Sequence, residues 1–169
     1  MIIHQIFISL KEGATLSKEH KNAKVYEKSH KLWIEFCKKH NYTYMLWDGD
    51  SIDELLAEEG LPTKFYFPNG SEMKFGKIDF ARYVFLNKFG GLYVDLDIYP
   101  KEGFNDILKR PILINKWRKT YFNKDGSIEK YGKYEIQNGL MKFPKGFTKD
   151  LIQYALHEYR RITKIPIYK

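Results

Sequence analysis

The sequence predicts an α/β fold with a central, mostly parallel sheet flanked by helices. Short apolar runs rich in β-branched and aromatic residues alternate along the chain with longer segments of helical periodicity, which is the pattern of such folds. The chain has 169 residues, of which 43% are hydrophobic, enough for one domain with its own core. The sequence contains no internal repeat, low-complexity tract or Pro/Gly-rich linker, so we expect residues 1–169 to form a single domain.

The first part of the chain predicts two strands and two helices. Hydrophobic periodicity gives a strand over residues 2–8, a loop over 13–17, a helix over 20–40, a strand over 42–47 and a helix over 52–58. The intervening Asp48-Gly49-Asp50-Ser51 is a turn. Its Asp50 or Ser51 can cap the helix that follows.

The second part predicts further alternation. The elements are a helix over residues 77–89, a strand over 92–96, a short strand over 111–115, one or two strands over 134–143 and an amphipathic helix over 147–162. Gly90-Gly91 ends the first of these helices, as glycine often does. Residues 116–133 are charged, and we expect them to be irregular or hairpin-like.

Charge and cysteine content limit the possible partners. A net charge of +8 and an isoelectric point near 9.3 favour anionic partners. Because the lysines are spread along the chain, they indicate a solvated surface rather than a nucleic-acid stripe, and we expect no nucleic-acid partner. Cys37 is the single cysteine and lies in an apolar helical pattern, so we expect a buried thiol.

Membrane and targeting signals are not evident in the sequence. No stretch approaches the roughly 20 apolar residues that a membrane-spanning helix needs. The first residues lack a basic leader and a small-residue cleavage site. We therefore expect a soluble, cytoplasmic protein, or a catalytic domain taken from a longer chain.

Asp95-Leu96-Asp97 is the first candidate for chemistry. Two carboxylates two residues apart on a strand point to the same face, and here they would lie at the strand's carboxyl end, where α/β folds bind ligands. Like charges among apolar neighbours cost free energy unless a cation balances them. Mg²⁺ and Mn²⁺ take oxygen ligands and commonly bridge carboxylates to substrate phosphates. Considered alone, the motif favours a solvated strand end without special function over a metal site.

Asp79 and Arg82 strengthen this hypothesis. Their i, i+3 spacing places them on one helix face, away from the apolar stripe. Gly90-Gly91 reverses the chain and returns the next strand beside the helix, so these two side chains can converge with Asp95 and Asp97. Considered alone, the pair would be a surface ion pair of small energetic value. Together with the downstream aspartates, a shared pocket is the better interpretation.

This segment resembles the sugar-binding region of DXD-motif glycosyltransferases, a group that includes fungal α-1,6-mannosyltransferases, capsular-polysaccharide transferases and, more distantly, glucosylating clostridial toxins. The matching residues are Lys77-Ile78-Asp79-x-x-Arg82-Tyr83, Gly90-Gly91-x-Tyr93-x-Asp95-x-Asp97 and Pro100. Residues 2–7, Trp47-Asp48 and Asn138-Gly139 are weaker matches. The resemblance implies a single GT-A domain, which is Rossmann-like.

The resemblance also implies a role for each matching residue. Asp97 would bind the metal directly, and Asp95 would reach it through water or contact the ribose and sugar. Asp79 and Arg82 would hold hydroxyl groups of the donor sugar, and Asn138 would face the diphosphate or the acceptor. Four further groups would lie near the nucleotide: Gln5, Phe7, Tyr93, and Trp47 or Asp48.

The implied activity is metal-dependent transfer of a sugar from a UDP- or GDP-sugar to a hydroxyl of a glycan, lipid or protein. Mn²⁺ or Mg²⁺ would stabilise the departing diphosphate as a Lewis acid. The carboxylates and Arg82 would orient a sugar ring whose transition state resembles an oxocarbenium ion. The sequence leaves the sugar, the base and the stereochemical outcome open.

Three other functions compete with this interpretation. Haloacid-type phosphatases also place Asp-x-Asp after an apolar strand, but that strand usually opens the fold, and Thr or Val follows where this chain has Tyr99. A metal-dependent nuclease would not explain Asp79 and Arg82. A non-enzymatic carbohydrate- or nucleic-acid-binding module fits the charge and the 17% aromatic content, but has no need for aspartates clustered at a strand end.

Overall fold

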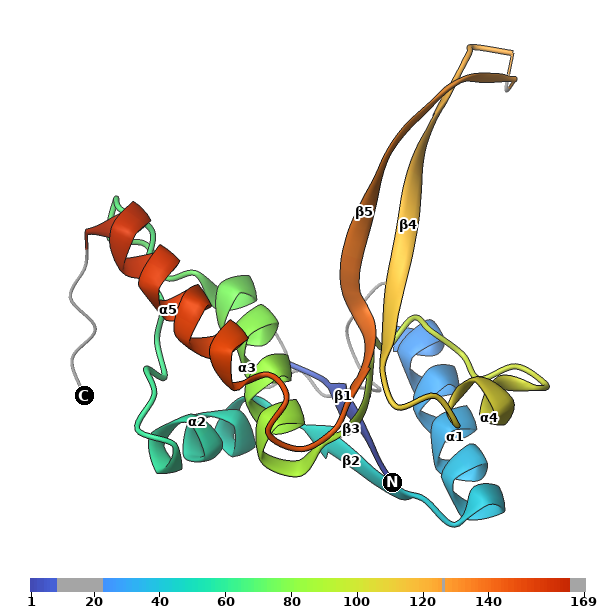
Figure 1. The fold of residues 1–169 in the computed structure, drawn as a ribbon, viewed down its shortest axis with the longest axis horizontal. Helices are drawn as coiled ribbons and strands as arrows, with labels where there is room; N and C mark the ends of the chain where they lie inside the picture. The colour runs from blue at the N-terminus through green and yellow to red at the C-terminus, as the bar shows by residue number, and fades with distance from the viewer. Residues whose placement is uncertain (9–22, 126, 165–169) are drawn as a thin grey trace.

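The computed structural model describes residues 1–8, 23–125 and 127–164. A five-stranded sheet in the order β2-β1-β3-β5-β4 forms its centre, with helices on either side (Figure 1). The described elements are β1 (Ile2–Ile6), α1 (Ala23–His40), β2 (Thr43–Trp47), α2 (Gly49–Glu58), α3 (Lys74–Phe89), β3 (Gly91–Val94), α4 (Phe104–Ile107), β4 (Leu113–Phe122), β5 (Ile128–Phe143) and α5 (Lys149–Thr163). The predicted α/β class is confirmed.

The sheet is mixed rather than mostly parallel. β1 runs parallel to β2 and to β3, so that Ile3 lies opposite Tyr44 on one side and Leu92 on the other. β5 then pairs antiparallel with β3, and β4 pairs antiparallel with β5. The expectation of a mostly parallel sheet is therefore wrong for the β3-β5-β4 half. The hairpin makes β4 and β5 antiparallel to each other, and its second strand, β5, is the one that pairs with β3, antiparallel as well.

Two apolar cores lie on opposite faces of this sheet, because successive strand residues point to alternate sides. Leu92 and Val94 pack with Trp33 and the buried Cys37 of α1, as predicted for the thiol. Tyr93, between them in sequence, packs in the other core with residues of α2, α3 and α5. In Figure 1, α2, α3 and α5 accordingly group on one side of the sheet and α1 and α4 on the other.

β4 and β5 continue well beyond the rest of the molecule as a long hairpin (Figure 1). Their pairing runs from Leu113 opposite Lys142 to Phe122 opposite Ile128, with several register shifts. The hairpin-like expectation for residues 116–133 is thereby confirmed. Burial along β5 begins at Gly139, so the base of the hairpin belongs to the core while its outer part is exposed.

Some helix boundaries differ from those predicted. α2 begins at Gly49 and is capped by Asp48, not by Asp50: Ser51 N donates to Asp48 Oδ1 at 2.9 Å, and Asp48 N donates to Ser51 Oγ at 2.9 Å. This reciprocal arrangement is a capping box. The predicted loop over residues 13–17 lies outside the described residues. None of the helices in the described part is both long and apolar enough to cross a membrane.

Candidate active site

Asp95 and Asp97 lie in a turn that directly follows β3. The strand ends at Val94, and Ile98 N donates to Asp95 O at 3.1 Å. The predicted strand over residues 92–96 is therefore too long, and strand alternation does not set the direction of the two carboxylates. Both nevertheless line one pocket, and they do so at the carboxyl end of β3.

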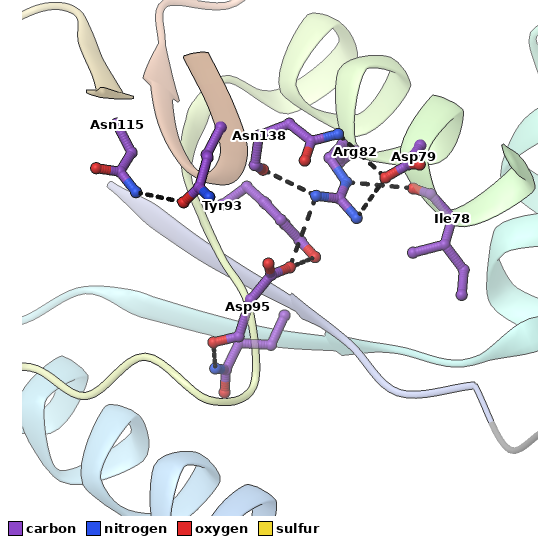
Figure 2. Close-up of polar contacts among 9 residues, drawn as sticks. Ile78, Asp79, Arg82, Tyr93, Asp95, Asn115 and Asn138 are labelled. Carbon is purple, nitrogen blue, oxygen red and sulfur yellow. Dashed lines mark hydrogen bonds and ion pairs between the residues drawn. The ribbon is translucent and has the colours of Figure 1, made fainter. Parts of the chain in front are cut away.

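Arg82 of α3 supplies the positive charge at this turn. Its side chain is only 6% exposed, and its guanidinium lies 2.9 Å from Asp79 Oδ1 and 3.6 Å from Asp95 Oδ1. Arg82 Nη1 also donates to the main-chain oxygen of Asn138 at 2.9 Å. One side chain thus joins α3 to the turn after β3 and to β5, as Figure 2 shows.

Tyr93 places a hydroxyl donor against the Asp95 carboxylate. Its ring is buried, and the guanidinium carbon of Arg82 lies 4.6 Å from the ring centroid, within the range of a cation–π contact. The Tyr93 hydroxyl donates to Asp95 Oδ1 at 2.5 Å. Burial raises the pKa of Tyr93 well above its ordinary value, and the nearby Arg82 opposes this rise only in part. The hydroxyl therefore stays protonated at neutral pH and holds Asp95 as a donor.

The base of β5 completes the site. Asn138 Nδ2 donates to Asp79 Oδ1 at 3.0 Å, and Figure 2 shows the amide directed toward Asp79 and Arg82. Gly139 O accepts from Asp95 N at 2.7 Å. At Gly139 the strand runs so close to the turn that a Cβ atom would overlap Asp95 Oδ2. A larger residue here would displace the Asp95 carboxylate, and glycine in a strand often marks such a close approach.

Arg82, Tyr93 and Asp95 line an open pocket of about 360 Å³, whereas Asp79 and Asn138 are not among its lining residues in the described part of the chain. This volume lies toward the small end of the range for small-molecule sites. The pocket combines a charged side with apolar and aromatic walls. Its lining residues are Ile6, Phe7, Ile8, Tyr26, Phe75, Ile78, Arg82, Tyr93, Asp95, Leu96 and Asp97.

Comparison with known proteins identifies the family. The model of the family described as glycosyltransferase sugar-binding region containing DXD motif matches residues 15–114, more than half of the chain. The chain belongs to this family. The resemblance predicted from residues 77–100 is thereby confirmed, and the family is one of enzymes. In this glycosyltransferase chain, Asp95-Leu96-Asp97 has the form of the DXD motif.

Two curated relatives agree with this assignment. An uncharacterized glycosyltransferase of Acanthamoeba polyphaga mimivirus is 32% identical over 111 residues, which cover 63% of this chain and 39% of that protein. A mannosyl phosphorylinositol ceramide synthase of Saccharomyces cerevisiae is 29% identical over 93 residues, which cover 54% of this chain and 24% of that protein. The matched part of this glycosyltransferase chain thus spans less than half the length of either relative.

The nucleotide-binding residues predicted for this glycosyltransferase do not all reach the pocket. Phe7 and Tyr93 line it, whereas Gln5, Trp47 and Asp48 are not among its lining residues in the described part of the chain. Gln5 is fully buried between β2, α1 and the Asp95 main chain. Trp47 is stacked on Phe85 in the core, with ring centroids 5.2 Å apart. Asp48 is occupied as the cap of α2.

Other pocket residues were not predicted from the sequence. Phe75 and Ile78 precede Arg82 by seven and four residues, so their spacing along α3 already placed them on its face. Tyr26 of α1 also lines the pocket. No local signal in the sequence distinguishes it from the other aromatic residues, because its place depends on how α1 packs across the sheet.

The oxygen ligands at this turn fit a divalent cation, although charge balance does not demand one. The carboxylates of Asp95 and Asp97 are the hard oxygen ligands that Mg²⁺ and Mn²⁺ take. Within the described residues no three His, Cys, Asp or Glu side chains gather as a metal cluster, so further ligands would come from substrate phosphates and water. Arg82 already lies 3.6 Å from Asp95 and offsets part of the negative charge. The argument for a divalent cation here therefore rests on the oxygen ligands and not on a need to balance charge.

Proposed function

We propose that this domain, as a single catalytic unit, transfers a sugar from a nucleoside diphosphate sugar to an acceptor hydroxyl, with Mn²⁺ or Mg²⁺ bound. The observation that carries the proposal is that Arg82, Asp95 and Asp97 meet in one pocket at the carboxyl end of β3. Ligands of α/β proteins bind at this edge of the sheet. Asp79 adjoins the same group through its ion pair with Arg82.

Asp97 and Asp95 would hold the cation. When bound, the cation supplies Lewis-acid stabilisation of the charge that develops on the departing diphosphate. Asp97 is exposed and takes the role of direct ligand. Asp95 Oδ1 is engaged by the Tyr93 hydroxyl and Arg82, so its role is contact through water or with the ribose and sugar.

The donor sugar would lie against Asp79, Arg82 and Asn138. The Asp79 side chain is 54% exposed, so its carboxylate can accept from sugar hydroxyls while it remains paired with Arg82. Asn138 Nδ2 donates to the same Asp79 oxygen, Oδ1, that pairs with Arg82. Fixing these groups before the donor arrives lowers the entropic cost of orienting the sugar ring.

The nucleotide would occupy the aromatic part of the pocket. Phe7, Tyr26 and Phe75 line it, and aromatic side chains stack readily on bases. UDP- and GDP-sugars are the candidate donors. The yeast relative's name, a synthase of mannosyl phosphorylinositol ceramide, suggests a mannosyl donor and a lipid acceptor as one candidate pair. Hydroxyls of glycans and proteins are the other candidate acceptors.

A thermal-shift panel tests the proposal. UDP, GDP, CDP and TDP are each added with and without Mn²⁺, because a ligand that binds the folded state raises Tm by mass action. We expect a rise for UDP or GDP that requires Mn²⁺ and is lost in Asp97→Ala. Asp150→Ala is the matched control, since Asp150 is an exposed aspartate on α5.

The outcomes separate the competing functions. An equal rise in the natural chain and in Asp97→Ala would contradict the metal assignment. If none of the four diphosphates raises Tm, donor binding by this domain is contradicted. Oligosaccharides and nucleic acid would then be tested in the same way, because a non-enzymatic binding module is the alternative that the charge and aromatic content still fit.

A further inference from the structure

Hydrogen-bonded polar groups, half-buried at His30 and Tyr44 and fully buried at Gln5, lead from α1 through two strands to the DXD turn. His30 Nδ1 lies 2.8 Å from the Tyr44 hydroxyl, which donates to Gln5 Oε1 at 2.8 Å. Gln5 Nε2 lies 3.3 Å from Asp95 O and 3.3 Å from Ser29 Oγ. The series thus connects a helix on one side of the sheet with the main chain of Asp95.

The direction of each hydrogen bond in this series is determined. Because the Tyr44 hydroxyl gives its single proton to Gln5, it must accept from His30 Nδ1. Gln5 Oε1 is then the acceptor and Gln5 Nε2 the donor, which orients the amide toward Asp95 O. Asp95 O can only accept, so it sets the direction of the Gln5 amide, and the Tyr44 hydroxyl holds the other end of that amide by donating to Oε1.

The other end of the turn is held from α1. The carbonyl oxygen of Ile98 accepts from Ser29 Oγ at 2.9 Å and from Trp33 Nε1 at 2.8 Å. Gln5, Ser29 and Trp33 are each fully buried. Breaking one of these hydrogen bonds would leave a buried donor or acceptor without a partner, which costs more free energy than breaking a hydrogen bond in water. These contacts therefore resist rearrangement. Both ends of the Asp95–Ile98 turn are consequently fixed through their carbonyl oxygens.

We propose that Gln5, held in place by a hydrogen bond from Tyr44, is a positioning residue for the proposed metal site rather than a nucleotide contact. Asp97 lies inside the turn, and its carboxylate is exposed, so its place is set by the main chain on either side. Gln5 acts on that main chain and not on the ligand. This inference rests on the proposed function, because it concerns how Asp97 is presented to the cation.

Mn²⁺ affinity tests the inference directly. Free and bound Mn²⁺ are distinguished by EPR during titration with Mn²⁺ alone, Mn²⁺ with UDP and Mn²⁺ with GDP, at a temperature where every variant is folded. We expect Gln5→Met, which keeps the side-chain length but removes the amide, to weaken Mn²⁺ binding about tenfold, as loss of a group that orients a metal ligand typically does. Tyr44→Phe should weaken Mn²⁺ binding less, because the Gln5 amide keeps its hydrogen bond to Asp95 O and loses only the donor to its Oε1.

Two comparisons separate positioning from a general loss of stability or a direct contact. Tyr159→Phe is the matched control, since the Tyr159 hydroxyl also accepts and donates hydrogen bonds, at 2.8 Å and 3.2 Å to Tyr66 between α5 and a loop. It should lower Tm without changing the Mn²⁺ Kd. Affinity for UDP or GDP at saturating Mn²⁺ should stay unchanged in Gln5→Met, whereas loss of a direct nucleotide contact would reduce it.

Each result has a defined meaning. If Asp97→Ala loses Mn²⁺ but Gln5→Met and Tyr44→Phe bind it like the natural chain, the positioning role is overturned and the proposed function stands. If Tyr159→Phe weakens Mn²⁺ binding equally, the effect is general and the positioning role is again overturned. If the natural chain binds no Mn²⁺, both the proposed metal site and this inference are contradicted. If Gln5→Met does not fold, the Mn²⁺ affinity of Tyr44→Phe tests the positioning role instead.

Discussion

At Gly139 the main chain of β5 leaves no room for a side chain beside Asp95. The Gly139 carbonyl accepts from Asp95 N at 2.7 Å, and an added Cβ would overlap Asp95 Oδ2. We expect Gly139→Ala to displace the carboxylate, to lower the free energy of unfolding by about 1–3 kcal/mol through overpacking, and to weaken Mn²⁺ binding. Urea unfolding and an EPR titration measure the two effects.

Gly49→Ala is the control for this substitution. A Cβ on Gly49 meets no atom within 4 Å, so neither stability nor Mn²⁺ affinity should fall. Normal Mn²⁺ binding by Gly139→Ala would show that the position of Asp95 Oδ2 does not matter to the cation, and Asp95 would then have to be withdrawn from the metal site.

The site residues that sequence reasoning located best are those with a fixed local spacing. Asp79 and Arg82 are paired at 2.9 Å on one face of α3, as i, i+3 spacing predicted, and Asp95 joins them at 3.6 Å from Arg82. Gln5 and Trp47 lie in strands, where successive side chains point to opposite faces of the sheet. A shift of one residue therefore decides whether a side chain faces the pocket or the core. Only the packing of α1 and α3 against the sheet shows that both are buried.

At the scale of an element, Asp48 belongs to the start of α2. Ser51 N donates to its carboxylate at 2.9 Å, and this hydrogen bond together with that from the Ser51 hydroxyl lowers the Asp48 pKa below its ordinary value. The stabilising contribution is therefore present above the ordinary pKa of aspartate and is lost as pH falls through the lowered one. We expect Asp48→Ala to lower the free energy of unfolding by about 1 kcal/mol at neutral pH, measured by urea unfolding.

The same variant tests whether Asp48 also contacts the nucleotide. If capping is its role, the rise in Tm caused by Mn²⁺ with UDP or GDP will match that of the natural chain. A smaller rise would support the nucleotide role that the sequence resemblance implied. Asp50→Ala is the control, because Asp50 lies in the first turn of α2 but is not its cap. Its effect on stability should be smaller than that of Asp48→Ala.

For the β4–β5 hairpin, the sequence predicted the local structure but not the place of the hairpin in the sheet. The charged segment over residues 116–133 was expected to be irregular or hairpin-like, and the structure shows a hairpin. The direction in which β5 joins β3 was not readable, because the sheet position of β5 depends on a long-range pairing, with Val94 opposite Leu140. That pairing is what brings Asn138 and Gly139 beside Asp79 and Asp95, so their contacts there followed from topology rather than local pattern.

At the scale of the whole molecule, His4 joins three parts of the fold. It lies fully buried on β1, accepts from Trp47 Nε1 of β2 at 3.1 Å through Nδ1, and donates from Nε2 to Gly90 O, 2.9 Å away, at the end of α3. Its ring also stacks on Phe85 at 4.9 Å. A second ring proton would point at the Trp47 N–H, so the packed fold favours the neutral imidazole.

This arrangement makes the stability of the fold depend on pH. Burial lowers the His4 pKa from 6.5 to about 4, with the Gly90 hydrogen bond opposing the shift. Between these values the unfolded chain binds a proton that the folded chain does not, so stability falls as pH decreases from 6.5 to about 4. The loss attributable to His4 is about 3 kcal/mol across that window.

Urea unfolding of the natural chain and of His4→Gln between pH 7 and pH 4 isolates this contribution. The difference between the two curves should shrink as pH falls, because only the natural chain has the buried imidazole, while carboxylates and His30 contribute to both. His157→Gln is the control: its side chain is 71% exposed, and its curve should parallel that of the natural chain. Parallel curves for His4→Gln, or an NMR titration midpoint of His4 near 6.5, would mean that the fold tolerates the imidazolium and that His4 does not couple stability to pH.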